Sequence, residues 1–361
     1  MMYDNVLKND ERAVLSLRSL YKSYGYQPFK MSKFEEYDLY ARNKDFLVSD
    51  RIITFTDTDG RLMALKPDVT LSIIKSGVDS GKRKVYYDEN VYRVSQKSGQ
   101  FREIMQTGIE CIGDIDINDV FESIYLAAES LSRISDSFVL DISHMGVVSA
   151  VLDGVGCTES VKSELIRLIS ERNLHELTDT CRSIGMSADG IASVGKLAEI
   201  YGNRRSVLTE LDDICTTDEA RVALEQLRLI DALLESYPFG DRVCFDFSLV
   251  NNMRYYNGIV FKGFVADISE SVLSGGEYAS LLSNMGKTGR GVGFALYLDR
   301  LEELESPSPE YDVDVLLVYS DVTSPASLFA KKQEYSADGS TVLAVREVPK
   351  KIKARSIVEL K

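Results

Sequence analysis

The sequence is poor in the residue types that most often bind metals or act as general bases. Among 361 residues there are two histidines, His144 and His175, and neither has a partner residue nearby in sequence, so we interpret both as core or surface residues. The five cysteines, at positions 111, 157, 181, 215 and 244, are odd in number and form no CxxC pair. These counts argue against a disulfide framework or a thiolate zinc site. We therefore expect buried free thiols, no metal and no cofactor.

Long hydrophobic runs and an excess of positive charge are also lacking. No apolar run approaches the roughly 18 residues of a membrane-spanning helix, and the opening segment MMYDNVLKNDER has no apolar stretch typical of a signal peptide. We therefore expect a cytoplasmic protein with no membrane partner. The formal net charge of −14 argues against general nucleic-acid binding, which needs clustered Lys and Arg. We interpret the one basic cluster, at 350–355, as a solvated tail.

What is present is an ordinary globular composition, with 44% hydrophobic and 27% charged residues and room for two or three domains. Apolar residues at helical spacing over 10–24, ended by Gly25, predict a helix. Residues 53–65 hold a Thr-Asp-Gly turn between two strand-like runs, which predicts a β-hairpin. Asp119, followed three residues later by Glu122, predicts the start of another helix, and 138–143 predict a strand.

The character of the chain changes twice after residue 145. Helical patterns dominate from 146 to 236, which predicts an all-helical insertion. Strand-like segments then return, and residues 289–304 predict a glycine-spaced strand that runs into a helix. We interpret the glycines at 286, 289, 291 and 293 as the entry to that strand, because they lack the residue order of a phosphate-binding loop. Residues 306–312 predict a linker, and a strand–helix–strand unit of about 50 residues follows it.

Residues 84–113 predict two strands joined by a polar loop, and the second strand has an unusual face. Because side chains alternate along a strand, Arg102, Gln106 and Glu110 form a row that carries a donor, an amide and a carboxylate. Gly108 in the same row leaves room for a close approach to the backbone. Such a row suits a small zwitterionic ligand, although the wet face of an ordinary antiparallel sheet gives the same pattern.

Several segments together resemble one family. The loop between these two strands, with Arg93, resembles motif 2 of class II aminoacyl-tRNA synthetases, and GVGFALYLDRLEEL resembles motif 3, with Arg300 at the arginine position. Within that class the chain resembles the histidyl-tRNA synthetase branch through LKPDVTLSIIK (65–75), QFREIMQTGIECIG (100–113), RYYNGIVF (254–261) and GGEYASLL (275–282). The resemblance covers roughly residues 5–305, and its motifs follow the family's order.

This resemblance implies an α+β fold, in which an antiparallel sheet of about six or seven strands is flanked by helices and dimerises through its N-terminal motif. We expect a class II synthetase-like domain at 1–305, with the helical insertion at 146–236 inside it. Residues 306–361 would then form a linker and a truncated, anticodon-binding-like α/β fragment.

The resemblance also implies a histidine pocket. Carboxylates and amides in it would accept hydrogen bonds from the α-ammonium or imidazole N–H groups, an arginine would pair with the ligand carboxylate, and two tyrosines would form a wall with hydroxyl tips. Its members would be Asp68, Thr70, Arg93, Gln106, Glu110, Tyr255 and Tyr256. Arg102 and Arg300 would remain as a vestigial nucleotide site, with Arg300 acting either as a clamp or as a structural residue.

Four positions depart from the synthetase pattern. The position four residues before the tyrosine pair, where synthetases carry an arginine that assists adenylate formation, is Asn251, and a neutral amide supplies no fixed positive charge. The glutamate expected after Arg93 is Ser95. Arginines of two further elements are replaced by Glu277 and Lys66. We therefore expect no catalytic residues.

This pattern resembles the regulatory subunits of ATP phosphoribosyltransferase, which are synthetase paralogues without aminoacylation. The resemblance implies a non-catalytic homodimer that joins a short catalytic subunit in a hetero-octamer. The complex would perform the first step of histidine biosynthesis under feedback control by L-histidine. Two alternatives stay open. One is an active histidyl-tRNA synthetase, for which the short C-terminus and acidic charge make tRNA a poor fit. The other is a synthetase-like sensor of histidine or tRNA.

Overall fold

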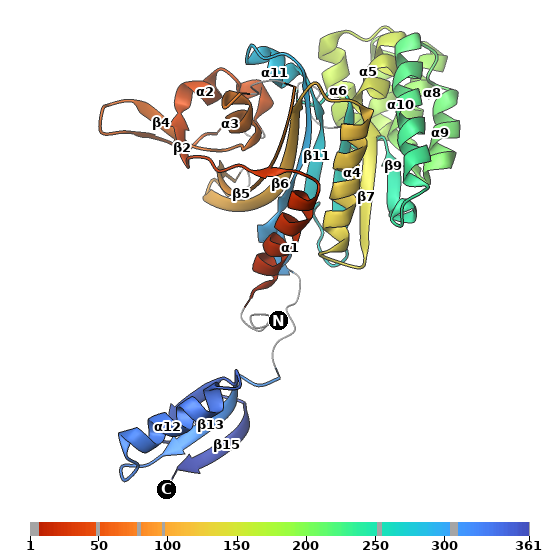
Figure 1. The fold of residues 1–361 in the computed structure, drawn as a ribbon. Coiled ribbons are helices and arrows are strands. Elements are labelled where there is room, and N and C mark those ends of the chain that lie inside the picture. Colours follow the sequence, from red (N-terminus) through yellow and green to blue (C-terminus); the bar gives the residue numbers. More distant parts are fainter. Residues whose placement is uncertain are drawn as a thin grey trace. The chain divides into compact units, whose positions relative to one another are not determined.

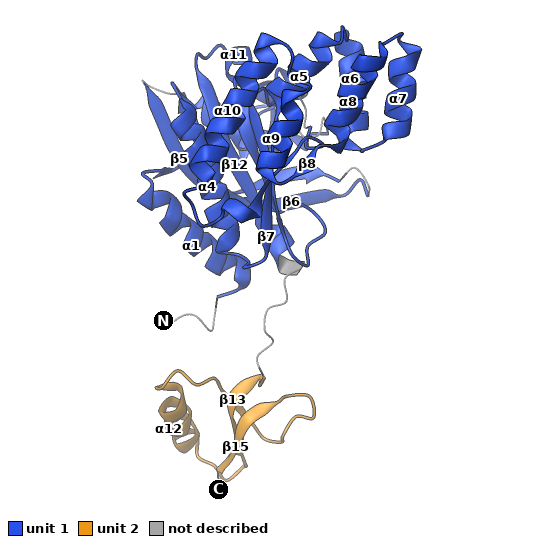
Figure 2. Cartoon of the chain, turned by 90° about the vertical axis from the view of Figure 1, so that its right-hand side faces the viewer, with its two compact units in different colours: residues 1–304 blue, residues 305–361 orange. Residues whose placement is uncertain are grey.

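A computed structural model of the chain describes residues 7–47, 51–77, 81–95, 98–250, 255–303 and 310–360. The chain divides into two compact units, residues 1–304 and residues 305–361 (Figure 1 and Figure 2). Asn251, whose substitution bears on catalysis, lies outside the described residues.

The larger unit combines helices with short and long strands. Its helices are α1 (Asn9–Ser23), α2 (Tyr37–Ala41), α3 (Thr70–Lys75), α4 (Ile117–Ser132), α5 (Met145–Gly154), α6 (Glu159–Ser170), α7 (Leu174–Ser183), α8 (Ala188–Glu199), α9 (Arg204–Asp212), α10 (Asp218–Leu234) and α11 (Ser280–Asn284), with 3-10 turns η1 (Lys44–Phe46), η2 (Gly240–Arg242) and η3 (Leu298–Glu303). Its strands are β1 (Gln27–Pro28), β2 (Phe34–Glu36), β3 (Thr54–Thr56), β4 (Leu62–Leu65), β5 (Lys82–Val94), β6 (Phe101–Gly113), β7 (Phe138–His144), β8 (Tyr201–Gly202), β9 (Val243–Asp246), β10 (Ile259–Val265), β11 (Leu273–Tyr278) and β12 (Arg290–Tyr297).

Within the described residues, nine strands form one sheet in the order β1-β5-β6-β12-β11-β10-β7-β9-β8. The six strands from β5 to β7 in this order run antiparallel to their neighbours, as the class II resemblance implies. The sheet is wider than the expected six or seven strands, because β1 and β9 add to it in parallel and β8 extends one edge.

The two faces of this sheet have different coverings. Helices α1 and α4 pack against one face, where Leu17 and Tyr21 of α1 share a core with Ile109 of β6 and Phe261 of β10. A second apolar cluster, which includes Tyr87 and Tyr278, lies on the other face with residues of α3 and α11. Helices α5 to α10 gather at the β7–β9 end of the sheet, as Figure 1 shows. The second face is covered only in part, and it carries the candidate site.

Several local predictions from the sequence are confirmed. Helix α1 spans nearly the predicted 10–24 and is followed by Gly25 at φ 83°. Strands β3 and β4 form the predicted hairpin, with Thr54 paired to Ala64. The predicted strand at 138–143 is β7, and α5 to α10 lie in the predicted helical stretch of 146–236. That stretch is not all-helical as predicted, because the two-residue strand β8 lies within it and pairs with β9.

Two helix boundaries differ from prediction. Helix α4 starts earlier than Asp119, because Asp116 is the N-cap and Asp119 is the third helical residue of the capping box. The Asp119 carboxylate accepts a hydrogen bond from the Asp116 backbone N–H at 2.9 Å. Beyond β12, the predicted helix is only the 3-10 turn η3.

The smaller unit contains β13 (Val313–Tyr319), α12 (Pro325–Ser336), β14 (Val342–Val345) and β15 (Ala354–Leu360). Strands β14 and β15 pair in parallel on either side of β13. The predicted strand–helix–strand unit therefore gains a third strand. The basic residues at 350–355 are exposed to solvent, as predicted, but they do not form a tail, since Arg355 lies in β15.

All five cysteines are free thiols, and those at 111, 181 and 215 are buried. His144 is buried, with its Nε2 3.0 Å from the Gln226 side chain, whereas His175 is exposed. No helix among the described residues combines the length and the apolar character that crossing a membrane requires.

Candidate functional site

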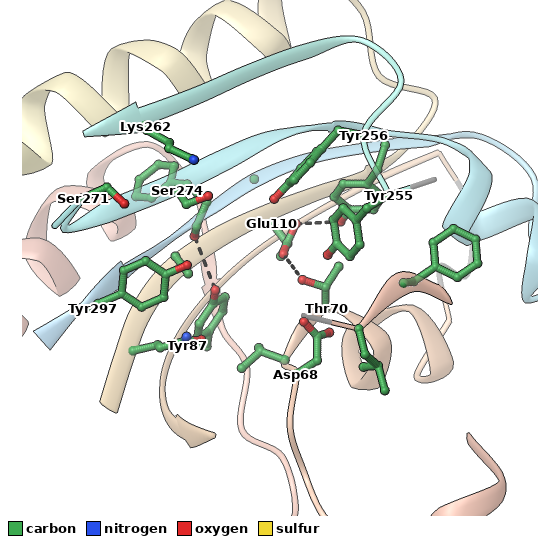
Figure 3. Close-up of a pocket in the computed structure, with 18 of the residues that line it drawn as sticks. Asp68, Thr70, Tyr87, Glu110, Tyr255, Tyr256, Lys262, Ser271, Ser274 and Tyr297 are labelled. Carbon is green, nitrogen blue, oxygen red and sulfur yellow. Dashed lines mark hydrogen bonds between the residues drawn. The ribbon is translucent and has the colours of Figure 1, made fainter. Parts of the chain in front are cut away.

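A cavity of about 380 Å³ lies on the second face of the sheet (Figure 3). It brings together all seven residues predicted for the ligand pocket: Asp68, Thr70, Arg93, Gln106, Glu110, Tyr255 and Tyr256. They come from four places in the chain, namely the start of α3, strand β5, strand β6 and the segment before β10. Side chains that the sequence did not predict complete the lining, among them Tyr87, Lys262, Ser271, Ser274, Tyr278 and Tyr297.

Glu110 is the buried carboxyl group at the floor of this cavity. Its Oε1 accepts a hydrogen bond from Thr70 Oγ1 and its Oε2 accepts one from the Tyr278 hydroxyl, both at 2.6 Å. Burial raises the pKa of Glu110 to about 7; the two hydrogen bonds lower it and the charge of Asp68 raises it. Glu110 therefore changes charge near neutral pH, and a cationic ligand group would hold it ionised.

Asp68 supplies a second carboxyl group at the same end of the cavity. Its Oδ1 accepts a hydrogen bond from the Leu71 backbone N–H at 2.9 Å. Burial raises the pKa of Asp68, while the Leu71 N–H and the nearby Arg93 charge lower it. Arg93 Nε in turn donates to the Pro67 carbonyl at 3.0 Å, which holds the guanidinium beside Asp68.

Gln106 presents an unsatisfied donor to the cavity. The residue is buried, and its Nε2 has no hydrogen-bond partner among the described residues. A buried donor without an acceptor costs about 1–3 kcal/mol, so an acceptor atom on a ligand would offset this cost. The amide is therefore placed to recognise a polar ligand.

Three tyrosines form one wall of the cavity. The ring centroids of Tyr255 and Tyr256 are 4.5 Å apart, and those of Tyr255 and Tyr278 are 5.8 Å apart. Burial raises the pKa of all three hydroxyls well above the ordinary value for tyrosine. The wall is therefore apolar along its rings, with hydroxyl groups that stay protonated and can donate hydrogen bonds.

Glycines on neighbouring strands make room for the large side chains of this face. A Cβ added at Gly108 would lie 2.7 Å from the Tyr87 hydroxyl, so the space that the sequence assigned to a ligand is taken by Tyr87. A Cβ added at Gly276 would lie 2.7 Å from Cδ1 of Tyr256. Both glycines therefore allow an aromatic ring to lie flat over the sheet.

Two glycines of β12 also make room for large side chains on this face. A Cβ at Gly291 would overlap the ring of Tyr278, and a Cβ at Gly293 would overlap the carboxylate of Glu110. The register pairs Tyr278 with Gly291 and Glu110 with Gly293 across β12. These glycines open the entry to the motif 3 strand, as predicted, and they also set where the two side chains lie.

Arg102 does not line the cavity, so the predicted row of three polar residues is only partly right. Pairing between β6 and β12 ends at Gln106 opposite Tyr297, and the start of β6 pairs only with β5. Arg102 therefore lies beyond the end of β12 and is exposed. Its charge still lowers the pKa of Asp299, although burial leaves that pKa raised overall.

Arg300 does line the cavity, but its guanidinium is engaged by the protein itself. Its Nη1 donates to the Ser271 carbonyl, and its Nη2 lies 3.0 Å from Glu270 Oε2. The guanidinium carbon is 4.6 Å from the ring centroid of Tyr297, which covers one side of the group. This arrangement favours the structural reading of Arg300 over a nucleotide clamp.

Two of the four departures from the synthetase pattern, Lys66 and Glu277, are charged side chains that pair within the protein. Lys66 is fully buried, with its Nζ 2.5 Å from Glu89 Oε2. Glu277 is buried and pairs with Arg290, with 2.5 Å between Oε1 and Nη1. Neither residue lines the cavity. In addition, no group of three or more His, Cys, Asp or Glu suited to hold a metal occurs in the described part of the chain.

The residues that sequence reasoning missed lie on strands far apart in the chain. Tyr87 faces the cavity because β5 pairs it with Gly108 of β6, and Lys262 does so because β10 pairs it with Ser274 of β11. Tyr278 lies in the segment GGEYASLL, which resembles the synthetase family, but the sequence predicted no role for it. Alternation within each strand identifies the face, but the pairing between strands is needed to bring these residues together.

Comparisons with known proteins place the chain among synthetase-like proteins. Residues 3–301 match the family of histidyl-tRNA synthetases. A curated relative, the ATP phosphoribosyltransferase regulatory subunit of Oceanobacillus iheyensis, is 26% identical over 353 residues, which cover 96% of this chain and 87% of the relative. A crystal structure of an ATP phosphoribosyltransferase regulatory subunit/histidyl-tRNA synthetase from Bacillus halodurans superposes with a TM-score of 0.79, at 25% identity over 97% of this chain and 93% of that one.

A further solved structure shares the fold. A chain of the ATP phosphoribosyl transferase (HisG:HisZ) complex from Thermotoga maritima superposes with a TM-score of 0.63 at 21% identity, over 79% of this chain and 96% of that chain.

Proposed function

The chain belongs to the histidyl-tRNA synthetase family, and within it we propose that the protein is a regulatory subunit of ATP phosphoribosyltransferase. The name of the Oceanobacillus relative, whose similarity spans nearly the whole chain, supports this choice. In this role the chain does not catalyse. It works with a separate short catalytic subunit, which performs the first step of histidine biosynthesis.

The observation that carries this proposal is the state of Arg300 at the motif 3 position. A synthetase needs a free cation there to bind nucleotide, whereas this guanidinium is bound to the Ser271 carbonyl and to Glu270 and is covered by the Tyr297 ring. A cavity that keeps its polar ligand groups while its nucleotide cation is occupied suits binding without adenylate chemistry.

We propose L-histidine as the ligand of the cavity. Glu110 and Asp68 offer negative charge to an ammonium or an imidazole N–H, and Gln106 Nε2 offers a free donor to an acceptor on the ligand. The Tyr255–Tyr256 wall supplies an apolar surface for the imidazole ring. Histidine would regulate the complex only if it binds one arrangement more tightly than another, and a coupling of about 1–3 kcal/mol is enough.

The proposed assembly is a homodimer that joins the catalytic subunits in a hetero-octamer. Apolar side chains on the N-terminal elements support a contact between copies of the chain. Leu15 of α1 is half exposed, and so are Phe34 and Leu62 on the three-stranded sheet β2-β4-β3. Apolar surface of this kind favours association.

Reconstitution tests the proposed function directly. The chain is mixed with a short ATP phosphoribosyltransferase catalytic subunit, and formation of phosphoribosyl-ATP is followed with and without histidine. We expect the chain to stimulate the reaction and histidine to inhibit the complex. A catalytic subunit that neither associates with the chain nor responds to it would overturn the proposal.

A histidyl-tRNA synthetase is the alternative that shares the family, and pyrophosphate exchange separates the two. With histidine and ATP as substrates, a synthetase exchanges pyrophosphate into ATP, and the proposed regulatory subunit does not. The net charge of −14 also disfavours a tRNA partner.

A further inference from the structure

Among the described residues, three cationic side chains line the cavity, and they differ in the contacts that they already make. Arg93 donates to the Pro67 carbonyl and lies beside Asp68, and Arg300 is engaged on two sides and covered by an aromatic ring. Lys262 is the third. Of these three cations, Lys262 is the one that makes no hydrogen bond or ion pair with a described residue.

The position of Lys262 in the sheet explains why its charge faces the cavity. Lys262 pairs with Ser274 on one side and with Asp141 on the other, so all three side chains stand on the same face. No ion pair joins Lys262 to Asp141, although the two residues are direct neighbours across the strands. The side chain instead extends into the cavity near Ser274 and Tyr256, as Figure 3 shows. A half-buried ammonium in this position requires an anion or water.

The far side of the cavity carries the opposite charge. Glu110 stands on β6, three strand spacings from Lys262 on β10 and two residues along β6 from Gly108, which shares the row of Lys262. The two backbone positions are therefore roughly 16 Å apart. The strands between them present the small residues Ser274 and Ala295 in the row of Lys262. The cavity thus has an acidic end and a basic end, with low side chains on the floor between them.

We propose that Lys262 binds the α-carboxylate of the amino-acid ligand and makes the cavity selective for a free carboxylate. The inference rests on the proposed function, in which that ligand is histidine. It reassigns the carboxylate from Arg93, the residue that the family resemblance implied, to a lysine on the sheet floor. Ser274 and the Tyr256 hydroxyl lie beside the lysine and would complete a hydrogen-bonding site for the same group.

Calorimetric titration with two ligands tests the assignment. L-Histidine and L-histidinol share the imidazole and the amine, but histidinol carries a hydroxymethyl group in place of the carboxylate. We expect the wild-type chain to bind histidine at least about tenfold more tightly, because a charge-assisted pair is lost with histidinol. In Lys262→Met, histidine binding weakens to the level of histidinol, and in Lys262→Arg the preference for histidine returns.

Arg93→Met is the matched comparison, since it removes the other cation that was assigned to the carboxylate. We expect it to weaken both ligands while keeping the preference for histidine. Loss of the preference in Arg93→Met, or its survival in Lys262→Met, would overturn the assignment. Circular dichroism verifies that each variant is folded, and the wild-type comparison of the two ligands needs no variant at all.

Failure of the inference is distinguishable from failure of the proposed function. If the wild-type chain binds histidine and histidinol equally, the carboxylate assignment is wrong while the histidine pocket stands. If wild type binds neither ligand, both the pocket and the assignment fall, whereas stimulation of the catalytic subunit remains a separate measurement.

Discussion

The Tyr278 hydroxyl donates a hydrogen bond of 2.6 Å to Glu110 Oε2, and the two residues are 168 positions apart in the chain. Tyr278 stands on β11 and Glu110 on β6, with β12 between them. The bond passes over β12 because Gly291 and Gly293 carry no side chains there. This hydrogen bond thus links β11 to β6 across β12, on the face that carries the cavity.

Removing this hydrogen bond should raise the pKa of the Glu110 carboxyl group. In Tyr278→Phe, Glu110 loses one of the two donors that favour its ionised form, so its pKa should rise above about 7. We expect a loss of about 0.5–1.5 kcal/mol in the free energy of unfolding, which is typical of one hydrogen bond. Carbon NMR of labelled glutamate measures the pKa, and an unchanged value would contradict the role of Tyr278.

Replacing Gly293 with alanine should displace Glu110. The added Cβ would overlap the Glu110 carboxylate and the Ile109 carbonyl, and a backbone atom cannot move away cheaply. We expect a destabilisation of about 1–3 kcal/mol and weaker histidine binding, measured by denaturant unfolding and calorimetry.

Gly195→Ala is the control for that substitution. Gly195 lies within α8, and a Cβ added there meets nothing within 4 Å. Because alanine is favoured over glycine by about 1 kcal/mol in a helix, this variant should be more stable than wild type and should bind histidine equally well. Equal effects of the two substitutions would refute the glycine argument.

Stability should depend on pH through Glu110. Its pKa is about 7 in the folded protein against an ordinary value of 4.5, so the folded state holds the proton more tightly than the unfolded chain. The resulting stabilisation is complete below about pH 4.5 and is lost as the pH rises through 7. A shift of this size corresponds to on the order of 3 kcal/mol.

Glu110→Gln should remove that dependence. Unfolding by urea at several pH values between 5 and 8 should show a smaller decline in the free energy of unfolding than in wild type. Burial also raises the pKa of Asp141 to about 7. Asp141 should therefore make its own contribution to the pH dependence of stability, which Asp141→Asn should remove. A wild-type slope that persists in both variants would place the titrating group elsewhere.

Removing only one partner of the buried Lys66–Glu89 ion pair should lower the free energy of unfolding more than removing both. Lys66→Met leaves the carboxylate of Glu89 without its cation in a nearly closed site, and loss of one buried partner typically costs about 3–5 kcal/mol. The double variant Lys66→Met, Glu89→Gln should recover most of this loss in denaturant unfolding. Additive losses in the double variant would show that the two charges do not interact.

Much of the cavity could be predicted because it lies within short segments. Alternation along β6 places Gln106 and Glu110 on one face, and the structure puts both in the cavity. The same alternation placed Arg102 beside them, which failed because β12 ends opposite Gln106 and leaves Arg102 beyond the sheet. Strand length in a neighbour is a tertiary property, and no local pattern encodes it.

Contacts that depend on register could not be predicted in the same way. That Tyr87 fills the space over Gly108, and that Lys262 shares a row with Ser274, follow from how β5, β6, β10 and β11 pair. A shift of one residue in any of these pairings would turn the side chains to the other face. The wider sheet has the same origin, since β1, β8 and β9 are too short to stand out as strands in the sequence.

The glycines of β12 have a consequence for how this cavity can change during evolution. The Glu110 side chain occupies space that a Cβ at Gly293 would fill, and the Tyr278 ring occupies space that a Cβ at Gly291 would fill. A substitution that enlarges either glycine forces a partner on another strand to shrink or move. We therefore expect ligand preference in this cavity to change through paired replacements on adjacent strands, because a larger residue at either glycine alone would collide with its partner.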